Sequence, residues 1–164
     1  MISGIQCETD TAKAHTLDAQ FMVEMEIFGL TTSTRTSSAY ALILIEAGGS
    51  RRLPIIIGAY EAQAIALEME QIKPPRPMTH DLTVQIINDL GGQIEHVVVH
   101  HLKEGTYYAN ISIKGPISLH KVDARPSDAI ALAVRFSCPI YVDELVLEEA
   151  GVVHEENLTE EGHM

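Results

Sequence analysis

Hydrophobic and polar residues alternate or cluster in short runs along most of the chain. Residues 23–27 (Val-Glu-Met-Glu-Ile) alternate between apolar and acidic side chains, the period-two pattern of a strand with one buried face. Two apolar runs flank residues 47–50 (Ala-Gly-Gly-Ser), which predicts a hairpin. Strands are expected at residues 23–27, 39–46, 51–57, 94–102, 107–113, 117–122 and 139–147.

Three other segments place apolar residues at the spacing of a helix. These helices are expected at residues 61–72, 79–90 and 127–136. Thr79 and Ser127 are predicted to cap the second and third helices, because a hydroxyl oxygen accepts a hydrogen bond from a free N–H of the first turn. In the second helix, Leu82, Ile86 and Leu90 fall on one stripe.

The order of the expected elements is three strands, two helices, three strands, one helix and one strand. Because the helices fall in two insertions and do not alternate with every strand, the pattern predicts a single α+β domain. Its sheet is expected to be mixed but mainly antiparallel, with about three helices packed on it. We expect a flexible leader at residues 1–21, the folded domain at 22–147 and an acidic tail at 148–164.

The formal net charge of −12 at first argues against binding a polyanion. The charge is unevenly distributed, however. Residues 1–24 hold four acids and one base, residues 25–143 hold twelve acids and ten bases, and residues 144–164 hold seven acids and no base. The middle of the chain is therefore nearly neutral, and nucleic acid stays open as a partner.

The remaining composition points to the cytoplasm and to no membrane partner. The longest apolar stretches, such as residues 39–45, are far shorter than the roughly 20 residues of a membrane helix. The first ten residues contain acids where a signal peptide carries Lys or Arg. Cys7 and Cys138 form neither a disulfide framework nor a CxxC metal site.

Two of the expected helices begin with similar sequences. Each has Arg-Pro, then a hydroxyl residue, then a carboxylate in the first turn, which predicts phosphate-binding roles for Arg76 and Thr79 in one and for Arg125 and Ser127 in the other. A helix start offers free N–H groups and partial positive charge, and a nearby guanidinium adds a fork suited to phosphate. The alternative is that the acids complement their own helix dipoles while the arginines form ion pairs.

Carboxylates near the three helix starts also predict a catalytic site. The candidate catalytic residues are Glu61, His80, Asp81, Asp123 and Asp128. Glu61, Asp81 and Asp128 are the candidate ligands for Mg²⁺ or Mn²⁺, because hard cations prefer oxygen ligands and can activate water for phosphodiester hydrolysis. His80 is a candidate base or ligand. Convergence of these five groups is an assumption, because the sequence contains no HExxH or tight DxD motif.

Three separated segments resemble the bifunctional nuclease domain family. They are residues 53–65 (Leu-Pro-Ile-Ile-Ile-Gly, then Glu-Ala-Gln-Ala-Ile after two residues), 75–82 (Pro-Arg-Pro-Met-Thr-His-Asp-Leu) and 123–132 (Asp-Ala-Arg-Pro-Ser-Asp-Ala-Ile-Ala-Leu). The resemblance covers roughly residues 22–147. It implies an α+β domain whose family takes its name from members that cleave both RNA and DNA. The candidate residues occupy motif positions of the family, and their roles here are hypotheses.

Two functions from different classes follow. The first is a metal-assisted nuclease of low sequence specificity that binds RNA or DNA weakly. The second is a non-enzymatic, oligomeric binding or regulatory module in which the same Arg and Asp residues form structural ion pairs. Self-association is expected in either case, because a sheet with helices on one side leaves a face or edge that another copy can cover.

Overall fold

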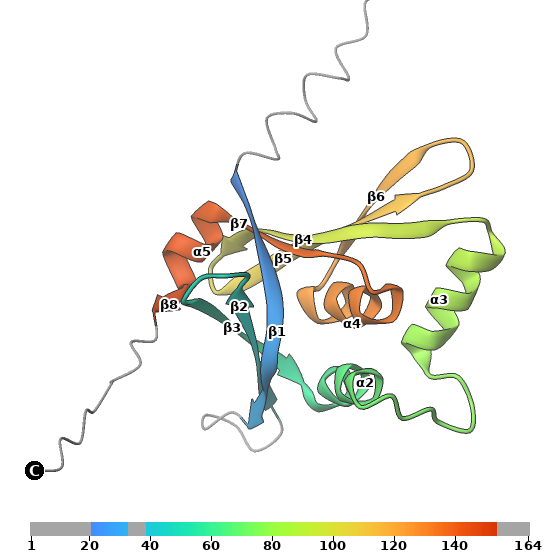
Figure 1. The fold of residues 1–164 in the computed structure, drawn as a ribbon, viewed down its shortest axis with the longest axis horizontal. Helices are drawn as coiled ribbons and strands as arrows, with labels where there is room; N and C mark the ends of the chain where they lie inside the picture. Colours follow the sequence, from blue (N-terminus) through green and yellow to red (C-terminus); the bar gives the residue numbers. More distant parts are fainter. Residues whose placement is uncertain (1–20, 33–38, 154–164) are drawn as a thin grey trace, which may run out of the picture.

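A single eight-stranded sheet organises the chain, with four helices against it in the described region (Figure 1). The computed structural model describes residues 21–32 and 39–153. The elements are β1 (Met22–Thr32), β2 (Ala39–Glu46), β3 (Arg51–Gly58), α2 (Ala59–Met69), α3 (Thr79–Asp89), β4 (Gln93–Lys103), β5 (Thr106–Lys114), β6 (Leu119–Ala124), α4 (Pro126–Phe136), β7 (Ile140–Asp143), α5 (Glu144–Ala150) and β8 (Val152–Val153). The predicted α+β class, with a mixed and mainly antiparallel sheet, is confirmed.

The short strand β7 joins two antiparallel halves of this sheet. The strand order is β6-β5-β4-β7-β1-β2-β3-β8. Strand β7 runs antiparallel to β1, where Ile140 pairs with Met25, and parallel to β4, where Ile140 pairs with Val97. This single parallel pair makes the sheet mixed.

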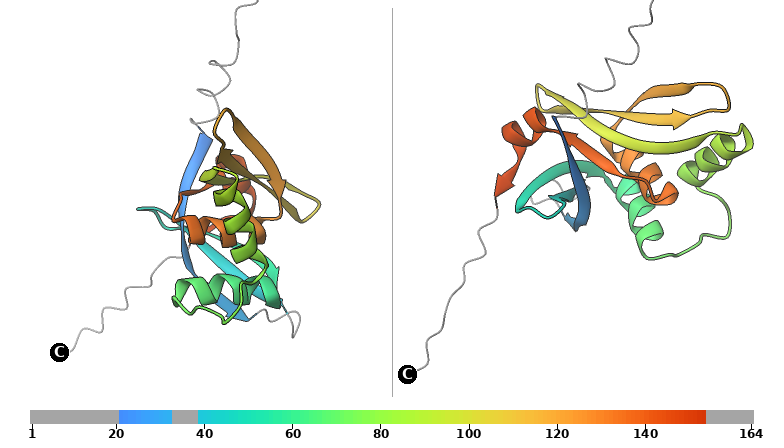
Figure 2. Two further views of the ribbon diagram at one scale, coloured as in Figure 1. Left: turned by 90° about the vertical axis from the view of Figure 1, so that its right-hand side faces the viewer. Right: turned by 45° about the horizontal axis from the view of Figure 1, so that its top comes forward.

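Helix α4 is the most deeply buried of the described helices. Its residues 129–133 are all apolar and all buried, in one cluster with Leu53 of β3, Ile65 of α2 and Val99 of β4. Helix α3 stands at one end of the molecule, and α5 and β8 stand at the other (Figures 1 and 2). Among the described helices, none is long and apolar enough to cross a membrane.

The end of the domain differs from the expected final strand at residues 139–147. The strand stops at Asp143, and helix α5 follows. The Asp143 side chain accepts a hydrogen bond of 2.9 Å from the Leu145 N–H, which caps that helix. The fold continues through β8 to Val153, so it includes residues 148–153 of the predicted tail. The predicted leader, except residue 21, and the tail beyond residue 153 lie outside the described residues.

The predicted hydroxyl caps are wrong, although the helices are where the pattern placed them. Met78 and Arg125 occupy the N-cap positions of α3 and α4, and neither helix has a side-chain cap from Thr79 or Ser127. In α4 the reason is Pro126, whose fixed backbone angle favours the first helical position and starts the helix one residue earlier.

Candidate functional site

Arg125 joins the starts of two helices. It is the N-cap residue of α4. One terminal nitrogen of its guanidinium lies 2.9 Å from Glu61 Oε1 in the first turn of α2. Its Nε lies 2.9 Å from Asp128 Oδ2 in the first turn of α4. These three residues and His80 are called the Arg125 cluster below.

His80 connects the third helix to this cluster. Its Nε2 lies 3.0 Å from Asp128 Oδ1, so the Asp128 carboxylate is held between Arg125 and the imidazole. A Cβ built on Gly58, the N-cap of α2, would clash with Glu61 Oε2. The Glu61 carboxylate therefore folds back over the start of α2, where the helix dipole favours negative charge.

A cavity of about 240 Å³ lies beside Arg125, between the end of β3, the turn from β4 to β5 and the start of α4. It is lined by Ile55, Ile56, Ile57, Gly58, Gly105, Thr106, Tyr107, Arg125, Pro126 and Ser127. Ser127 is 6% exposed as a whole residue. Its hydroxyl makes no hydrogen bond within residues 21–32 and 39–153 and is not among their buried unpartnered atoms, so its oxygen reaches the surface. The Arg125 side chain is 67% exposed. An unbonded hydroxyl and an accessible cation thus border one cavity at the starts of α2 and α4.

The open edge of β3 forms one wall of this cavity. Strand β8 pairs with Arg51 and Arg52 of β3. Residues two apart in a strand turn their N–H and C=O groups to the same edge, so Pro54 and Ile56 share the edge of Arg52. Consistent with this, the Tyr107 hydroxyl donates a long hydrogen bond of 3.4 Å to the Pro54 carbonyl. The N–H of Ile56 is therefore expected at the edge of β3 that borders the cavity.

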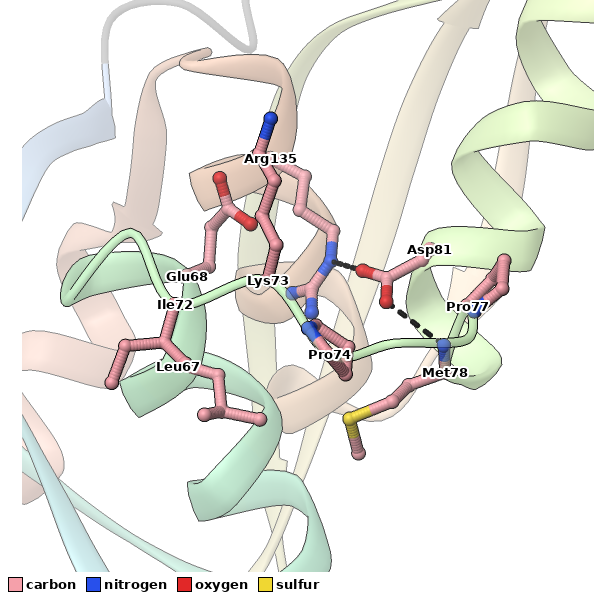
Figure 3. Close-up of a pocket in the computed structure, with 9 residues that line it drawn as sticks. All are labelled: Leu67, Glu68, Ile72, Lys73, Pro74, Pro77, Met78, Asp81 and Arg135. Carbon is pink, nitrogen blue, oxygen red and sulfur yellow. Dashed lines mark hydrogen bonds and ion pairs between the residues drawn. The ribbon is translucent and has the colours of Figure 1, made fainter.

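A second ion pair lies deeper between the helices (Figure 3). Arg135 is 6% exposed, and its Nε donates to Asp81 Oδ1 at 2.7 Å. Its terminal nitrogens donate to the carbonyls of Ala131 and Ala64 at 2.9 and 3.2 Å. The other Asp81 oxygen accepts from the Met78 N–H at 2.9 Å. Both ends of this pair are therefore engaged in holding α2, α3 and α4 together.

These contacts determine the protonation state of Asp81. Burial is the largest single influence and acts to raise the pKa of its carboxyl group. The hydrogen bonds from Arg135 and the Met78 N–H, with the nearby charges of Arg135 and His80, together outweigh burial, and the pKa of Asp81 is lowered. The ion pair also borders a cavity of about 270 Å³ whose other walls come from α2 and the loop before α3. Those walls are Leu67, Glu68, Ile72, Lys73, Pro74, Pro77 and Met78.

The remaining predicted residues lie apart from the Arg125 cluster. Asp123 pairs with Asn110 in the β5–β6 ladder. Burial lowers the pKa of His100 of β4, and Asp123 opposes part of that shift. Arg76 is exposed in the loop before α3, and Thr79 is exposed at the first position of that helix.

The structure thus brings Glu61, His80 and Asp128 together around Arg125. Asp81 instead pairs with Arg135, and Asp123 lies in the β5–β6 strand pair. In residues 21–32 and 39–153, no three His, Cys, Asp or Glu side chains are grouped so that they could hold a metal ion. The Mg²⁺ or Mn²⁺ site stays a prediction.

Sequence reasoning missed Arg135, Thr106 and Tyr107. Arg135 lies seven residues after Asp128, two turns along α4, so both fall on one face of that helix. A polar pair at this spacing in an otherwise apolar segment was the available signal. Nothing comparable marked Thr106 and Tyr107, which reach the cavity from a turn distant in sequence.

Comparison with known proteins supports the resemblance. A model of the bifunctional nuclease domain matches residues 42–155. An uncharacterized protein of Mycobacterium tuberculosis strain H37Rv is 44% identical over 140 residues, which are 85% of this chain and 83% of that protein. Bifunctional nuclease 1 of Arabidopsis thaliana is 26% identical over 116 residues, 68% of this chain and 36% of that protein. Bifunctional nuclease 1 of Oryza sativa subsp. japonica is 25% identical over 117 residues, 69% of this chain and 35% of that protein.

Proposed function

The chain belongs to the bifunctional nuclease domain family, and on that premise we propose that it hydrolyses phosphodiester bonds of RNA, DNA or both with low sequence specificity. One observation carries the proposal. The accessible guanidinium of Arg125 and the unbonded hydroxyl of Ser127 border one cavity where α2 and α4 begin. Helix starts with a nearby arginine are favourable sites for phosphate.

In this proposal the cavity binds the phosphate group. Arg125 supplies a forked donor, and Ser127 supplies a hydroxyl that needs a partner once it is closed off from water. Gly58 and Ile56 contribute backbone groups at the edge of β3 to the wall of the cavity. No lining residue carries an amide side chain or a second cation for reading base edges. Low sequence specificity follows from this lining. Arg76 and Thr79, outside the cavity, are proposed to contact neighbouring parts of a longer strand.

The carboxylates of the Arg125 cluster would support the chemistry. Glu61 and Asp128 are the residues that would hold Mg²⁺ or Mn²⁺, since magnesium is commonly bound by one or two carboxylates together with phosphate oxygens and water. A bound divalent cation would supply charge neutralisation at the phosphate. Asp81 fits this role poorly because it lies apart from the Arg125 cluster, bound to the largely buried Arg135. His80 acts as a positioning residue through its hydrogen bond to Asp128.

A second candidate function is the non-enzymatic binding or regulatory module. The observation in its favour is that each carboxylate of the Arg125 cluster is already paired, Glu61 with Arg125 and Asp128 with both Arg125 and His80. A cluster of this kind can hold helix starts together without any reaction. In that case phosphate or nucleic acid would bind at the cavity and leave unchanged.

Cleavage of labelled single-stranded RNA and DNA separates the two functions. Wild type, Arg125→Met and Lys114→Met would be purified identically and assayed with Mg²⁺, with Mn²⁺ and with a chelator. Lys114 is exposed at the opposite end of β5 from the cavity, so its variant removes the same charge elsewhere. We expect cleavage by wild type and by Lys114→Met, and a loss of about 100-fold in Arg125→Met, the effect typical of removing a charged contact to a reacting phosphate.

Cleavage that persists in Arg125→Met would contradict the assigned site and indicate a contaminating nuclease or another site. Binding of the oligonucleotides that depends on Arg125, without cleavage in any cation, would support the binding module. If the protein neither bound nor cleaved the oligonucleotides, both candidate functions would be rejected.

A further inference from the structure

The outer face of α3 carries an apolar stripe that nothing in the described chain covers. The sequence pattern identified the stripe correctly, but the structure turns it away from the core: Leu82, Ile86 and Leu90 are 51%, 50% and 73% exposed. The side of α3 that packs against the core instead carries Val84 and Ile87. In its described surroundings, no residue of α3 is fully buried. A helix with more apolar surface outside than inside indicates a missing partner.

The surroundings extend this apolar surface. Pro116, in the turn between β5 and β6, approaches the C-terminal end of α3: its Cγ would lie 3.1 Å from a Cβ built on Gly91. Ile117, next to it, is almost fully exposed. Figure 2 shows α3 standing clear at one end of the molecule, with no other element in front of it. The surface is therefore open to a second molecule.

The stripe also lacks the charges that the rest of the chain carries. Asp89 is the one ionisable side chain that flanks it within α3, because His80 and Asp81 of that helix point inward to Asp128 and Arg135. The whole chain has a net charge of −12, so two copies repel each other over most of their surfaces. A contact between copies requires an apolar surface poor in acids, and this stripe provides one.

We propose that α3 is the contact between two copies of this chain, packed antiparallel about a twofold axis that passes beside Ile86. The sequence of the stripe is symmetric, Leu-Ile-Leu at intervals of four residues. A twofold axis at its centre places Ile86 against its own copy and Leu82 against Leu90 of the partner subunit, so every apolar residue meets an apolar residue. Interlocking of rows four residues apart is the commonest mode of helix packing in globular proteins.

Another exposed apolar surface, on the sheet, fits a twofold contact less well. Phe28 of β1 and Ile56 of β3 are both more than half exposed. The guanidinium of Arg52, however, lies 4.1 Å from the centre of the Phe28 ring and covers it with a cation. Two copies meeting there would bring two of these cations together. The α3 proposal rests on exposure, charge and symmetry, so a negative cleavage assay leaves it unaffected.

Sedimentation analysis of the full chain tests the proposal. Three variants each introduce an acidic group: Ile86→Glu in the stripe, Asn88→Asp on the same helix but turned away from it, and Phe28→Glu on the sheet. We expect the wild type to form a dimer. Association of Ile86→Glu should be at least about thirtyfold weaker, the effect expected for a residue at the centre of an interface. Asn88→Asp and Phe28→Glu should associate nearly as the wild type does. Circular dichroism checks that each variant keeps its helix content. A monomeric wild type, or a dimer disrupted by Phe28→Glu and not by Ile86→Glu, would overturn the proposal.

Disulfide trapping tests the predicted twofold axis. In a background of Cys7→Ser and Cys138→Ala, Ile86→Cys is expected to cross-link with itself under mild oxidation. Leu82→Cys alone is not, because its copy would lie about 12 Å away along the helix axis, beyond the reach of a disulfide. The double variant Leu82→Cys with Leu90→Cys is expected to cross-link between subunits. Self-linkage of Leu82→Cys in place of Ile86→Cys would show that the copies meet differently and would reject the arrangement.

Discussion

Arg51 and Arg125 each bind two carboxylates from different parts of the chain, but they stand in different surroundings. Arg51 donates to both oxygens of Glu46, at 2.8 and 2.7 Å, and also pairs with Glu144 at the start of α5. Its side chain is 28% exposed, and it lines neither of the two cavities described above. Arg125 is 67% exposed and borders a cavity.

The difference separates a structural clamp from a candidate binding site. The hydrogen bonds that Arg51 donates lower the pKa of Glu46. Donating to the carboxylates of Glu46 and Glu144 raises the pKa of Arg51 far above its usual value. This cluster fixes the β2–β3 turn to α5. The Arg135–Asp81 pair borders the other cavity, but we group it with the closed clusters because the Arg135 side chain is only 6% exposed and bonds to three helices. The Arg125 cluster is open on the side of the cavity, where a phosphate can approach the guanidinium.

The largest expected effect is a loss of stability, which should be greater when the closed Arg135–Asp81 pair is broken than when Arg125 is replaced. Arg135→Met would leave Asp81 without its partner in a partly buried position, and breaking such a pair costs about 3 kcal/mol. Urea denaturation at pH 7 measures the free energy of unfolding. Arg125→Met is expected to lose less than about 1 kcal/mol, because its side chain is largely exposed. An equal loss in both variants would remove the distinction between open and closed clusters.

The next effect separates the same clusters by ligand binding. Replacing Arg125 with Met is expected to weaken the binding of a single-stranded oligonucleotide by about tenfold, the equivalent of one charge-assisted hydrogen bond. Replacing Arg51 with Met is expected to leave it nearly unchanged. Fluorescence anisotropy at fixed, moderate salt provides the dissociation constants. Equal weakening by both substitutions would indicate a general charge effect.

A smaller effect appears in the pH dependence of stability. Folding lowers the pKa of Asp81. The ionised Asp81 side chain therefore contributes fully to the free energy of unfolding above the unfolded-state pKa of about 3.9, and this contribution is lost as the pH falls through the folded-state pKa. The difference in unfolding free energy between wild type and Asp81→Asn should be about 1 kcal/mol at pH 7 and should shrink below about pH 4. A difference that stays constant down to pH 2 would mean that the ionised form of Asp81 adds nothing.

The smallest effect concerns the position of Glu61. Gly58→Ala introduces a Cβ that would clash with Glu61 Oε2, and the flexible carboxylate can move aside. We expect a change in stability within about 0.5 kcal/mol, as for a surface substitution, but altered oligonucleotide affinity, because Glu61 would no longer hold Arg125 in place. Unaltered affinity would show that the Glu61–Arg125 pair does not position the guanidinium.

The sequence predicted local structure well and contacts between distant segments poorly. The apolar run of α4 and the alternation in β1 identify those elements because burial follows the period of the backbone. Helix α5 escaped notice because residues 144–150 are too short to show a helical period and follow directly from β7. The partner of Asp81 escaped notice because Arg135 lies 54 residues away.

The stripe on α3 shows a further limit of pattern reasoning. Its periodicity is that of a packed helix, and periodicity does not distinguish a face buried in the core from a face exposed to a second molecule. In the candidate site, the similar starts of α3 and α4 suggested equivalent roles. The structure gives them different partners, with Arg125 bound to Glu61 and Asp128 but Arg76 left exposed in its loop.

The central claim, that the Arg125 cluster is the phosphate-binding site, is tested most directly by nuclear magnetic resonance. Uniformly ¹⁵N-labelled protein would be titrated with inorganic phosphate and, separately, with a short single-stranded oligonucleotide, while the backbone N–H signals and the arginine Nε–H signals are followed. We predict saturable shifts of the Gly58, Ser127 and Arg125 signals with both ligands, and no comparable shift of Arg51. Shifts centred on another surface, or movement of Arg51 as large as that of Arg125, would contradict the claim.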